Sequence, residues 1–404
     1  MIKTIFKTKF QASPASKEEG YLYYQIICNR TVWKIKTDYK VLAAEWDKHS
    51  ETLVLNPSHT DPQRLNWLQL LQKRLENDRK RLLQILSELP ERKSGITAAE
   101  VSAIYQQRLQ RLSLSNFMLS VIQQLKAADK TRTSEVYSIT LKSFMQFRQN
   151  QDILLDEITP EVIMRYEAYL NRKGSSRNTI SFYMRTLRAV YNRAVAQKLV
   201  TQCFPFKKVY TGMEKTFKRA VPIKAIRLIK GLDLSRKPSL QLARDLFLFS
   251  FYTRGMSFVD MAYLKKKDLQ HGLLVYNRRK TGQRLFIRWE KPMQEIIDRY
   301  DTAESEYLLP IITRKGNERK QYENALRTTN RQLKKIAALA RLPATLTMYV
   351  ARHSWASIAK NKNIPLSVIS ESMGHNSENT TKIYLTSLSQ DTIDNANKTI
   401  LKDL

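Results

Sequence analysis

Cysteine and histidine are scarce in this sequence of 404 residues. The two cysteines, Cys28 and Cys203, lie far apart and lack metal-ligand spacing, which argues against a disulfide scaffold and a zinc module and fits a reducing cytoplasm. The five histidines are scattered, whereas a metal site requires a cluster of ligands. We therefore expect a protein without a metal site.

Long apolar runs are also missing. No stretch approaches the ~20 apolar residues that a membrane-spanning helix needs. The opening residues, "MIKTIFKTKFQ", lack the apolar segment of a secretory signal. These two absences favour a protein that neither crosses a membrane nor is exported.

Acidic residues are outnumbered by basic ones. The chain has 37 Asp and Glu residues against 69 Lys and Arg residues, which gives a formal net charge of +32. An excess of this size is typical of a protein that binds a long polyanion. Nucleic acid is the first candidate for this partner, and an anionic membrane surface is the second.

Changes in composition along the chain predict a multidomain, mainly α-helical protein. We expect a small β-rich domain over residues 1–60, a linker helix over 61–95, an all-α domain over 96–208 and a mixed α+β domain over 215–404. The linker helix should begin at Pro62, and Asp78 interrupts its leucine stripe. A coiled-coil seam and packing on a neighbouring domain both account for that stripe.

Alternating residues in the β-rich segment predict a sheet with two different faces. In "TVWKIKTDY", Trp33 and Ile35 alternate with Lys34 and Lys36, so one face packs and the other is cationic. A solvated sheet face explains the lysines as well as a phosphate-binding face does. We assign Lys34 and Lys36 to nucleic-acid binding as the hypothesis to test.

The all-α domain ends in an unusually basic helix. From Asn171 to Lys198 there are seven basic residues and no acidic one, whereas a solvated helix normally mixes both signs. We therefore expect a surface that faces phosphates, with contributions from Arg177, Arg185, Arg188 and Arg193. Three earlier helices are expected to have their N-caps at Ser115, Thr133 and Thr159.

The last domain holds three pieces that together suggest phosphodiester chemistry. An arginine opens the helical stretch "TRGMSFVDMAYL", and a β-hairpin, "GLLVYNRRKTGQRLFIRW", places Lys280, Thr281 and Gly282 at its turn. The third piece is "YVARHSW", followed 23 residues after Arg352 by His375 and nine residues later by Tyr384. Tyrosine can attack a phosphate, arginines can clamp its oxygens, and a lysine can protonate the leaving oxygen, all without a metal or cofactor.

The spacing in "ARHSW…MGHNSENTTKIYL" resembles the C-terminal signature of the tyrosine recombinase, or phage integrase, family. "SRNTISFYMRTLRAVYNRAVAQKLV" is similar to the last helix of that family's core-binding domain, and the β-rich start resembles its arm-binding domain. "RGMSFVDMAYL" and "YVARHSWA" look most like integrases on mobile elements of anaerobic gut bacteria. The resemblance implies three domains: arm-binding, SAM-like core-binding, and a catalytic domain of the tyrosine recombinase type.

The resemblance also implies roles for individual residues. Tyr384 would attack the scissile phosphate and form a 3′-phosphotyrosine, and Arg352 would hold the phosphate. His375 would donate to a phosphate oxygen, and Lys280 would protonate the 5′ oxygen. Each has a structural alternative: a packed tyrosine, an ion-paired arginine, a helix-capping histidine and a solvated turn lysine.

Two positions depart from the family pattern. Tyr349 stands where the family has a histidine that helps accept the tyrosine proton, and a phenol with a pKa near 10 is a poor base at neutral pH. His353 or His375 could share that role. Ser257 occupies the usual place of the first arginine. We take Arg254 as its replacement, although it could instead pair with Asp260, and Arg278 and Arg279 are the alternatives.

The sequence therefore predicts a cytoplasmic, nucleoid-associated enzyme that cuts and rejoins double-stranded DNA at specific sites. The resemblance implies a monomer in solution that forms a homotetramer on synapsed sites, with accessory DNA-bending proteins compatible with this scheme. Integration, excision and inversion stay open, as do three rivals: a type IB topoisomerase, a non-catalytic DNA-binding regulator, and a basic scaffold with no site preference, which leaves the C-terminal spacing unexplained. Ile393, Ala396, Ile400 and Leu404 predict a tail helix that docks on its own domain or on a neighbouring protomer.

Overall fold

The computed structural model describes residues 5–14, 16–28, 31–55, 61–88, 97–214 and 220–384. The chain divides into two compact units, Met1–Glu214 and Lys215–Leu404. The predicted class is confirmed, because helices dominate both units and a small β-sheet opens the first. The predicted tail helix lies outside the described residues, and the finer division into domains stays a prediction.

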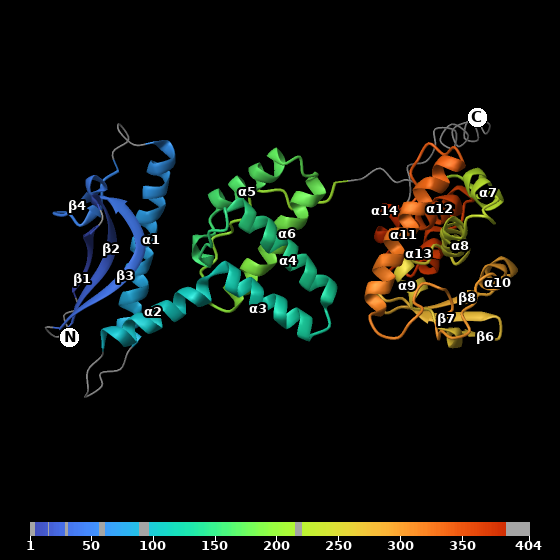
Figure 1. Ribbon diagram of the computed structural model, residues 1–404, viewed down its shortest axis with the longest axis horizontal. Coiled ribbons are helices and arrows are strands. Elements are labelled where there is room, and N and C mark those ends of the chain that lie inside the picture. The colour runs from blue at the N-terminus through green and yellow to red at the C-terminus, as the bar shows by residue number, and fades with distance from the viewer. Residues whose placement is uncertain are drawn as a thin grey trace, which may run out of the picture. The chain divides into compact units, whose positions relative to one another are not determined.

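The first unit begins with a three-stranded antiparallel sheet in the order β1-β2-β3. Trp33 and Ile35 are buried while Lys34 and Lys36 are exposed, as the alternation predicted. The strands of this region are β1 (Ile5–Ser13), β2 (Ser16–Cys28), β3 (Thr31–Leu42), β4 (Trp46–Asp47) and β5 (Thr52–Leu53), and the short helix η1 (Ala43–Glu45) lies between β3 and β4. The helix predicted to begin at Pro62 is α1 (Pro62–Glu88), which lies along the sheet (Figure 1).

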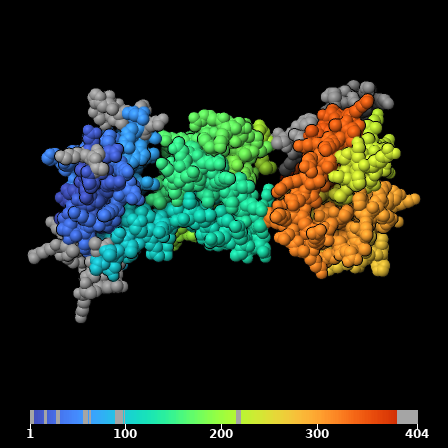
Figure 2. All heavy atoms as spheres, viewed as in Figure 1, coloured from blue at the N-terminus to red at the C-terminus, as the bar shows by residue number. Residues whose placement is uncertain are grey.

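Two apolar clusters join α1 to the sheet. One contains Leu82 and Ile85 with Tyr24 and Trp33, and the other contains Leu68 and Leu71 among its members. In the space-filling view, the blue atoms of the sheet and α1 form one closely packed body (Figure 2). The leucine stripe therefore packs on the sheet.

The helical part of the first unit has one more helix than the sequence patterns indicated. Its elements are α2 (Ala98–Leu112), α3 (Leu114–Ala127), α4 (Thr131–Phe147), η2 (Leu155–Glu157), α5 (Pro160–Arg172) and α6 (Arg177–Ala196). The missed helix, α2, carries a capping box in which Thr97 and Glu100 bond each other's backbone N–H groups. That signal was readable in the sequence.

Two of the three predicted N-caps in this part are wrong. Ser113, not Ser115, caps α3 by accepting a hydrogen bond from the backbone N–H of Asn116 at 3.0 Å. Thr133 lies inside α4, which begins at Thr131 without a side-chain cap. Only Thr159 is confirmed, since its side chain accepts from Val162. Serine and threonine occur at several positions near these helix starts, so residue type alone did not identify the capping residue.

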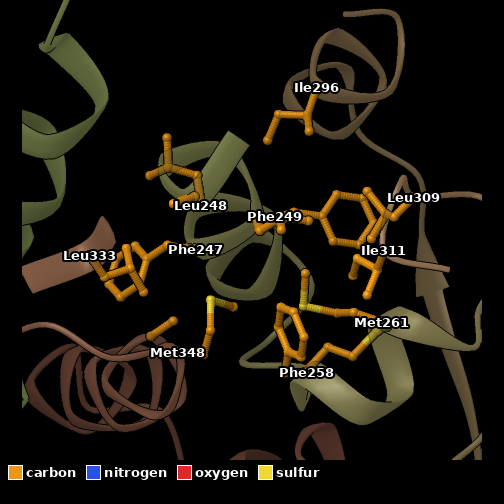
Figure 3. Close-up of a cluster of buried hydrophobic side chains, with 14 of the residues drawn as sticks. Phe247, Leu248, Phe249, Phe258, Met261, Ile296, Leu309, Ile311, Leu333 and Met348 are labelled. Carbon is orange, nitrogen blue, oxygen red and sulfur yellow. The ribbon is translucent and has the colours of Figure 1, made fainter. Parts of the chain in front are cut away.

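The second unit is a mixed α+β domain built around α8. Its elements are α7 (Ile223–Gly231), α8 (Pro238–Tyr252), α9 (Phe258–Ala262), η3 (Lys266–Asp268), β6 (Leu269–Gln270), β7 (Leu273–Asn277), β8 (Arg284–Arg288), α10 (Lys291–Ile297), α11 (Glu318–Leu339), α12 (Met348–Asn361), α13 (Leu366–Ser372) and α14 (Glu378–Tyr384). Phe247 and Phe249 of α8 are fully buried. Figure 3 shows them on different sides of the helix, Phe247 beside Leu333 and Phe249 towards Leu309. A helix that is apolar on several sides belongs in the centre of a domain.

The strands β6, β7 and β8 form an antiparallel sheet, and the predicted hairpin joins β7 to β8. Arg278 and Gln283 close its loop through a backbone hydrogen bond of 2.8 Å, and Gly282 adopts a positive φ of 72°. Lys280 and Thr281 therefore lie at the tip, as predicted. This hairpin is one wall of the candidate site.

Candidate active site

Arg352 is a nearly buried cation on α12, with 4% of its surface exposed. Its Nη1 donates to the carbonyl of Gly255 at 2.6 Å, and its Nη2 donates to the carbonyl of Met373 at 2.7 Å. Gly255 has a φ of +74°, and a Cβ there would lie 2.8 Å from the Cα of Arg352, so this turn needs glycine. Backbone carbonyls thus fix the direction of the guanidinium.

His375 lies between Arg352 and α14, immediately after α13. Its Nε2 is 2.9 Å from Nη2 of Arg352, and its Nδ1 is 2.7 Å from Oγ1 of Thr381. A guanidinium only donates, so Nε2 is the acceptor and a neutral ring carries its proton on Nδ1. Burial first, and then the charges of Arg352, Arg278 and Lys280, lower the pKa of His375 to about 3. The imidazole is therefore uncharged at neutral pH.

Thr381 attaches α14 to this cluster. Its side chain is fully buried against His375, and Tyr384 follows three residues later as the last residue of α14. Residues three apart lie on one face of a helix. The side chain of Tyr384 itself lies outside the described part of the structure. Sequence reasoning missed Thr381, because its contact depends on how α14 folds back onto the loop after α13.

Arg278 enters the cluster from the hairpin. It is 5% exposed, and its Nη1 donates to the carbonyl of Gly374. Gly374 has a φ of +65°, and a Cβ there would lie 3.0 Å from Cδ of Arg278. Arg278 also lowers the pKa of His375, as does the exposed Lys280 two residues further on. The structure thus brings Arg352, His375, Arg278 and Lys280 to one place.

Ser257 and Arg279 have other contacts. Ser257 caps α9, and its hydroxyl donates to Oδ2 of Asp260 at 2.6 Å. Arg279 donates its backbone N–H to Oδ1 of the same carboxylate at 2.9 Å, while its guanidinium stacks on Tyr263 at 3.9 Å. Arg279 and Tyr263 also line a cavity of about 240 Å³. Asp260 therefore fastens the hairpin to α9 rather than pairing with Arg254.

Arg254 and Tyr349 lie nearer the surface. Arg254 is half-buried in a left-handed conformation with a φ of 59°. It contributes, with Arg352 and Arg278, to the positive field at Tyr276, whose pKa is raised mainly by burial. Tyr349 is 53% exposed and packs edge-on against His353, with ring centroids 4.6 Å apart. The phenol thus occupies an open position on α12, one turn before the buried His353.

The histidine makes the stability of the protein depend on pH in a definite direction. The pKa of His375 falls from 6.5 to about 3 on folding, so between these values the unfolded chain binds more protons. We expect the free energy of unfolding to rise with pH in this window, by at most ~1.4 kcal/mol per unit from this group, and to level off above it. Denaturant unfolding of wild type and His375→Gln from pH 4 to 8 measures the difference. Parallel curves for the two proteins would contradict the assignment.

The residues predicted to bind nucleic acid lie on two surfaces of the first unit. Arg177, Arg185, Arg188 and Arg193 are all exposed on α6. Two of them also hold the connector that follows: Arg177 stacks on Tyr210 at 4.4 Å, and Arg188 donates to Thr211 at 3.3 Å. On the sheet, Lys34 lies over the ring of Tyr23 at 5.5 Å from the ring centroid. Lys36, two residues further along β3, is also exposed.

Within the described ranges, no group of three or more His, Cys, Asp or Glu side chains is placed to hold a metal ion. No helix in the described part of the chain is long and apolar enough to cross a bilayer.

Two family models match the chain over most of its length. Residues 113–209 match the phage integrase SAM-like domain, and residues 232–391 match the phage integrase family. The chain is 25% identical over 227 residues to tyrosine recombinase XerA of Thermococcus kodakarensis, which covers 55% of this chain and 75% of that protein. It is 24% identical over 286 residues to tyrosine recombinase XerC of Thermodesulfovibrio yellowstonii, which covers 67% of this chain and 90% of that protein.

Solved structures show the same fold. A lambda integrase tetramer bound to a Holliday junction matches with a TM-score of 0.53 at 14% identity, covering 93% of this chain and 97% of that one. The Tn1549 transposon integrase in complex with a circular intermediate DNA matches with a TM-score of 0.52 at 16% identity, covering 70% and 98%. The matched family models and the curated relatives define an enzyme of the site-specific recombinase class. The chain belongs to the tyrosine recombinase, or phage integrase, family.

Proposed function

We propose that this recombinase cuts and rejoins DNA through a 3′-phosphotyrosine on Tyr384 and serves the integration and excision of a mobile element. The observation that carries the proposal is the contact chain from Arg352 through His375 to Thr381, which ends one helical turn before Tyr384. These contacts connect Arg352, the proposed phosphate-binding cation, to α14, the helix that ends at the proposed nucleophile. The likeness to an integrase from a transposon supports integration over inversion.

In the proposed cleavage step, the phenolic oxygen of Tyr384 attacks the phosphorus and the bond to the 5′ oxygen breaks. Arg352 and Arg278 neutralise the charge on the non-bridging oxygens, where fixed donors stabilise the transition state most. Lys280 gives a proton to the departing 5′ oxygen. The phosphotyrosine ester keeps the bond energy, so rejoining needs no ATP.

The proton of Tyr384 needs an acceptor. Neutral His375 is a weak base in the free protein because its pKa is low, and a bound phosphate opposes that shift since negative charge favours the imidazolium. We assign His375 a share of this proton at Nε2, and the protonated ring then donates from Nε2 to a phosphate oxygen. Tyr349, an exposed phenol beside His353, is assigned a hydrogen bond to phosphate rather than the role of base.

The first-arginine role is assigned to Arg278 in place of the Arg254 expected from sequence. Arg278 is buried against the loop that carries His375, whereas Arg254 is half-buried on a turn. Arg279 is less suited, because its guanidinium is stacked on Tyr263 beside a separate cavity. The arginine missing from position 257 is thus replaced from the hairpin.

The enzyme is proposed to act as a tetramer on two synapsed DNA sites, with accessory bending proteins where the sites lie far apart. The lysine face of the sheet would bind arm-type sites and α6 would bind the core site, in the bacterial cytoplasm on nucleoid DNA. Strand exchange would pass through a Holliday junction. Phosphate contacts should make the affinity fall steeply with salt.

A nicked suicide duplex made from the element's ends tests the proposal. Cleavage releases the short strand, so the protein–DNA adduct accumulates and appears on a denaturing gel. We expect an adduct and, with a second duplex, recombinant strands. Relaxation of a plasmid that lacks recombination sites, without any strand exchange, would instead identify a type IB topoisomerase-like activity. Binding with no adduct would identify a regulator.

Lys280→Ala should slow cleavage by roughly 10²–10⁴-fold with little loss of binding, because a general acid acts only in the chemical step. A substrate with sulfur in place of the bridging 5′ oxygen should restore most of the rate, since a thiolate leaves without a proton. Single-turnover cleavage and gel shifts measure both. Lys291→Ala, an exposed lysine on α10, is the control. Equal losses in binding and cleavage would reduce Lys280 to a phosphate contact.

A further inference from the structure

Asp78 is a carboxylate in the middle of the apolar stripe of α1, and none of its surface is exposed. A buried charge is costly unless it is paired and hydrogen-bonded. Replacing such a group by an apolar residue would often stabilise a protein. The presence of Asp78 therefore calls for a role other than packing.

Asp78 ties α1 to the sheet through two phenols. Its Oδ2 accepts hydrogen bonds from Oη of Tyr24 on β2 and Oη of Tyr39 on β3, both at 2.7 Å. Burial and then the charge of Asp78 raise the pKa values of Tyr24, Tyr39 and Tyr105, so these hydroxyls stay protonated. Tyr105 adds α2 to the same cluster, since it packs edge-on against Tyr24.

Arg81 extends the cluster from α1 to the helical part of the unit. Its Nη1 donates to Oδ1 of Asp78 at 2.7 Å, and its Nη2 donates to Asp156 on η2. Two turns nearer the start of α1, Arg74 binds Glu157 with two hydrogen bonds, from Nε at 2.6 Å and from Nη2 at 2.9 Å. Leu155, beside these carboxylates, is fully buried in the core of the helical part. The contacts therefore run from the middle of the sheet to the middle of the helical core.

We infer that Asp78, Arg81 and Arg74, with Asp156 and Glu157, form a polar joint that holds the sheet and the helical part as one rigid body. Hydrogen-bonded ion pairs require one geometry, whereas an apolar contact tolerates sliding. Asp78 is thus a positioning residue. If the sheet and α6 bind DNA as proposed above, the joint fixes the spacing of the two DNA segments that one protomer holds.

The joint can be tested without DNA, by measuring a distance across it. Spin labels are attached at Lys48→Cys, next to the sheet, and at Gln124→Cys, on α3, after Cys28 and Cys203 are replaced by serine. Both labelled side chains are exposed and lie away from the joint. Pulsed electron paramagnetic resonance should give a single narrow distance distribution for the otherwise unchanged protein.

Asp156→Asn combined with Glu157→Gln should broaden that distribution at least about twofold, because both outer carboxylates lose their charge while the Asp78 cluster stays intact. The control, Arg132→Gln with Glu135→Gln, removes an exposed ion pair within α4 and should leave it narrow. Circular dichroism checks that each variant is folded. An equally narrow distribution in the D156N/E157Q protein, whatever its melting temperature, would overturn the joint.

The DNA-cleavage result is independent of this measurement. A narrow distribution in the wild type with broadening in the variant supports the joint even if no covalent adduct forms. A covalent adduct in the absence of a broadened distance distribution would support the proposed function and contradict the joint.

Discussion

Tyr384→Phe should abolish covalent attachment to a suicide duplex while leaving DNA binding within about twofold of wild type. Removing the phenolic oxygen removes the only proposed nucleophile, and loss of a nucleophile typically costs roughly 10⁴-fold or more. Binding is proposed to depend on the lysine face of the sheet and on α6, which the change does not touch. Denaturing gels measure the adduct, and gel shifts measure the affinity.

Tyr137→Phe is a matched control, because Tyr137 is a partly buried tyrosine packed on the core of the helical part. It should form the adduct at the wild-type rate. Peptide mapping of the trapped complex should find the DNA on the fragment that contains Tyr384. An adduct formed by the Tyr384→Phe protein, or mapped to another residue, would end both the nucleophile assignment and the mechanism that depends on it.

Arg278→Lys should reduce single-turnover cleavage by roughly 10²–10³-fold, a loss typical of removing one donor from a transition-state oxyanion. Lysine keeps the charge but lacks the planar fork with which Arg278 donates to Gly374 and is proposed to bind a phosphate as well. Arg254→Lys should cost less than tenfold, because its guanidinium has no hydrogen-bond or ion-pair partner among the described residues that would hold it towards Arg352.

The two variants decide between the sequence-based assignment and the structural one. If Arg254→Lys lost more activity than Arg278→Lys, the original expectation for Arg254 would be restored. Arg314→Lys, in an exposed loop of the same unit, controls for the exchange of a guanidinium for an ammonium group at a position outside the site. Binding should change little in all three, so the comparison rests on the cleavage rates.

The sequence predicted most of the elements around the site, because their signals are local. The hairpin carrying Lys280 follows from alternation and a Gly turn, and the start of α1 follows from Pro62. The spacing of Arg352, His375 and Tyr384 predicted the family, which the family models confirm. The structure places Arg352 and His375 in contact.

What the sequence did not predict depends on contacts between distant segments. In the sequence, Asp78 looked like an interruption of a leucine stripe, because its contacts are with distant segments. Tyr24 lies 54 residues before Asp78. Asp156, which Asp78 reaches through Arg81, lies 75 residues after that arginine. Thr381 was missed for the same reason, because nothing in its local sequence indicates its contact with His375. The choice between Arg278 and Arg254 likewise needed the position of Gly374, which only the folded chain supplies.

The acceptors that hold Arg352 and Arg278 are peptide carbonyls, those of Gly255, Met373 and Gly374, and two of these residues have no room for a side chain. Peptide oxygens cannot be exchanged by mutation. A mutant library built to retarget this enzyme to new DNA sequences would therefore gain nothing from varying the residues of these turns. If the sheet and α6 bind DNA as proposed, useful variation should be confined to their outer surfaces, where recognition can change while the chemistry stays the same.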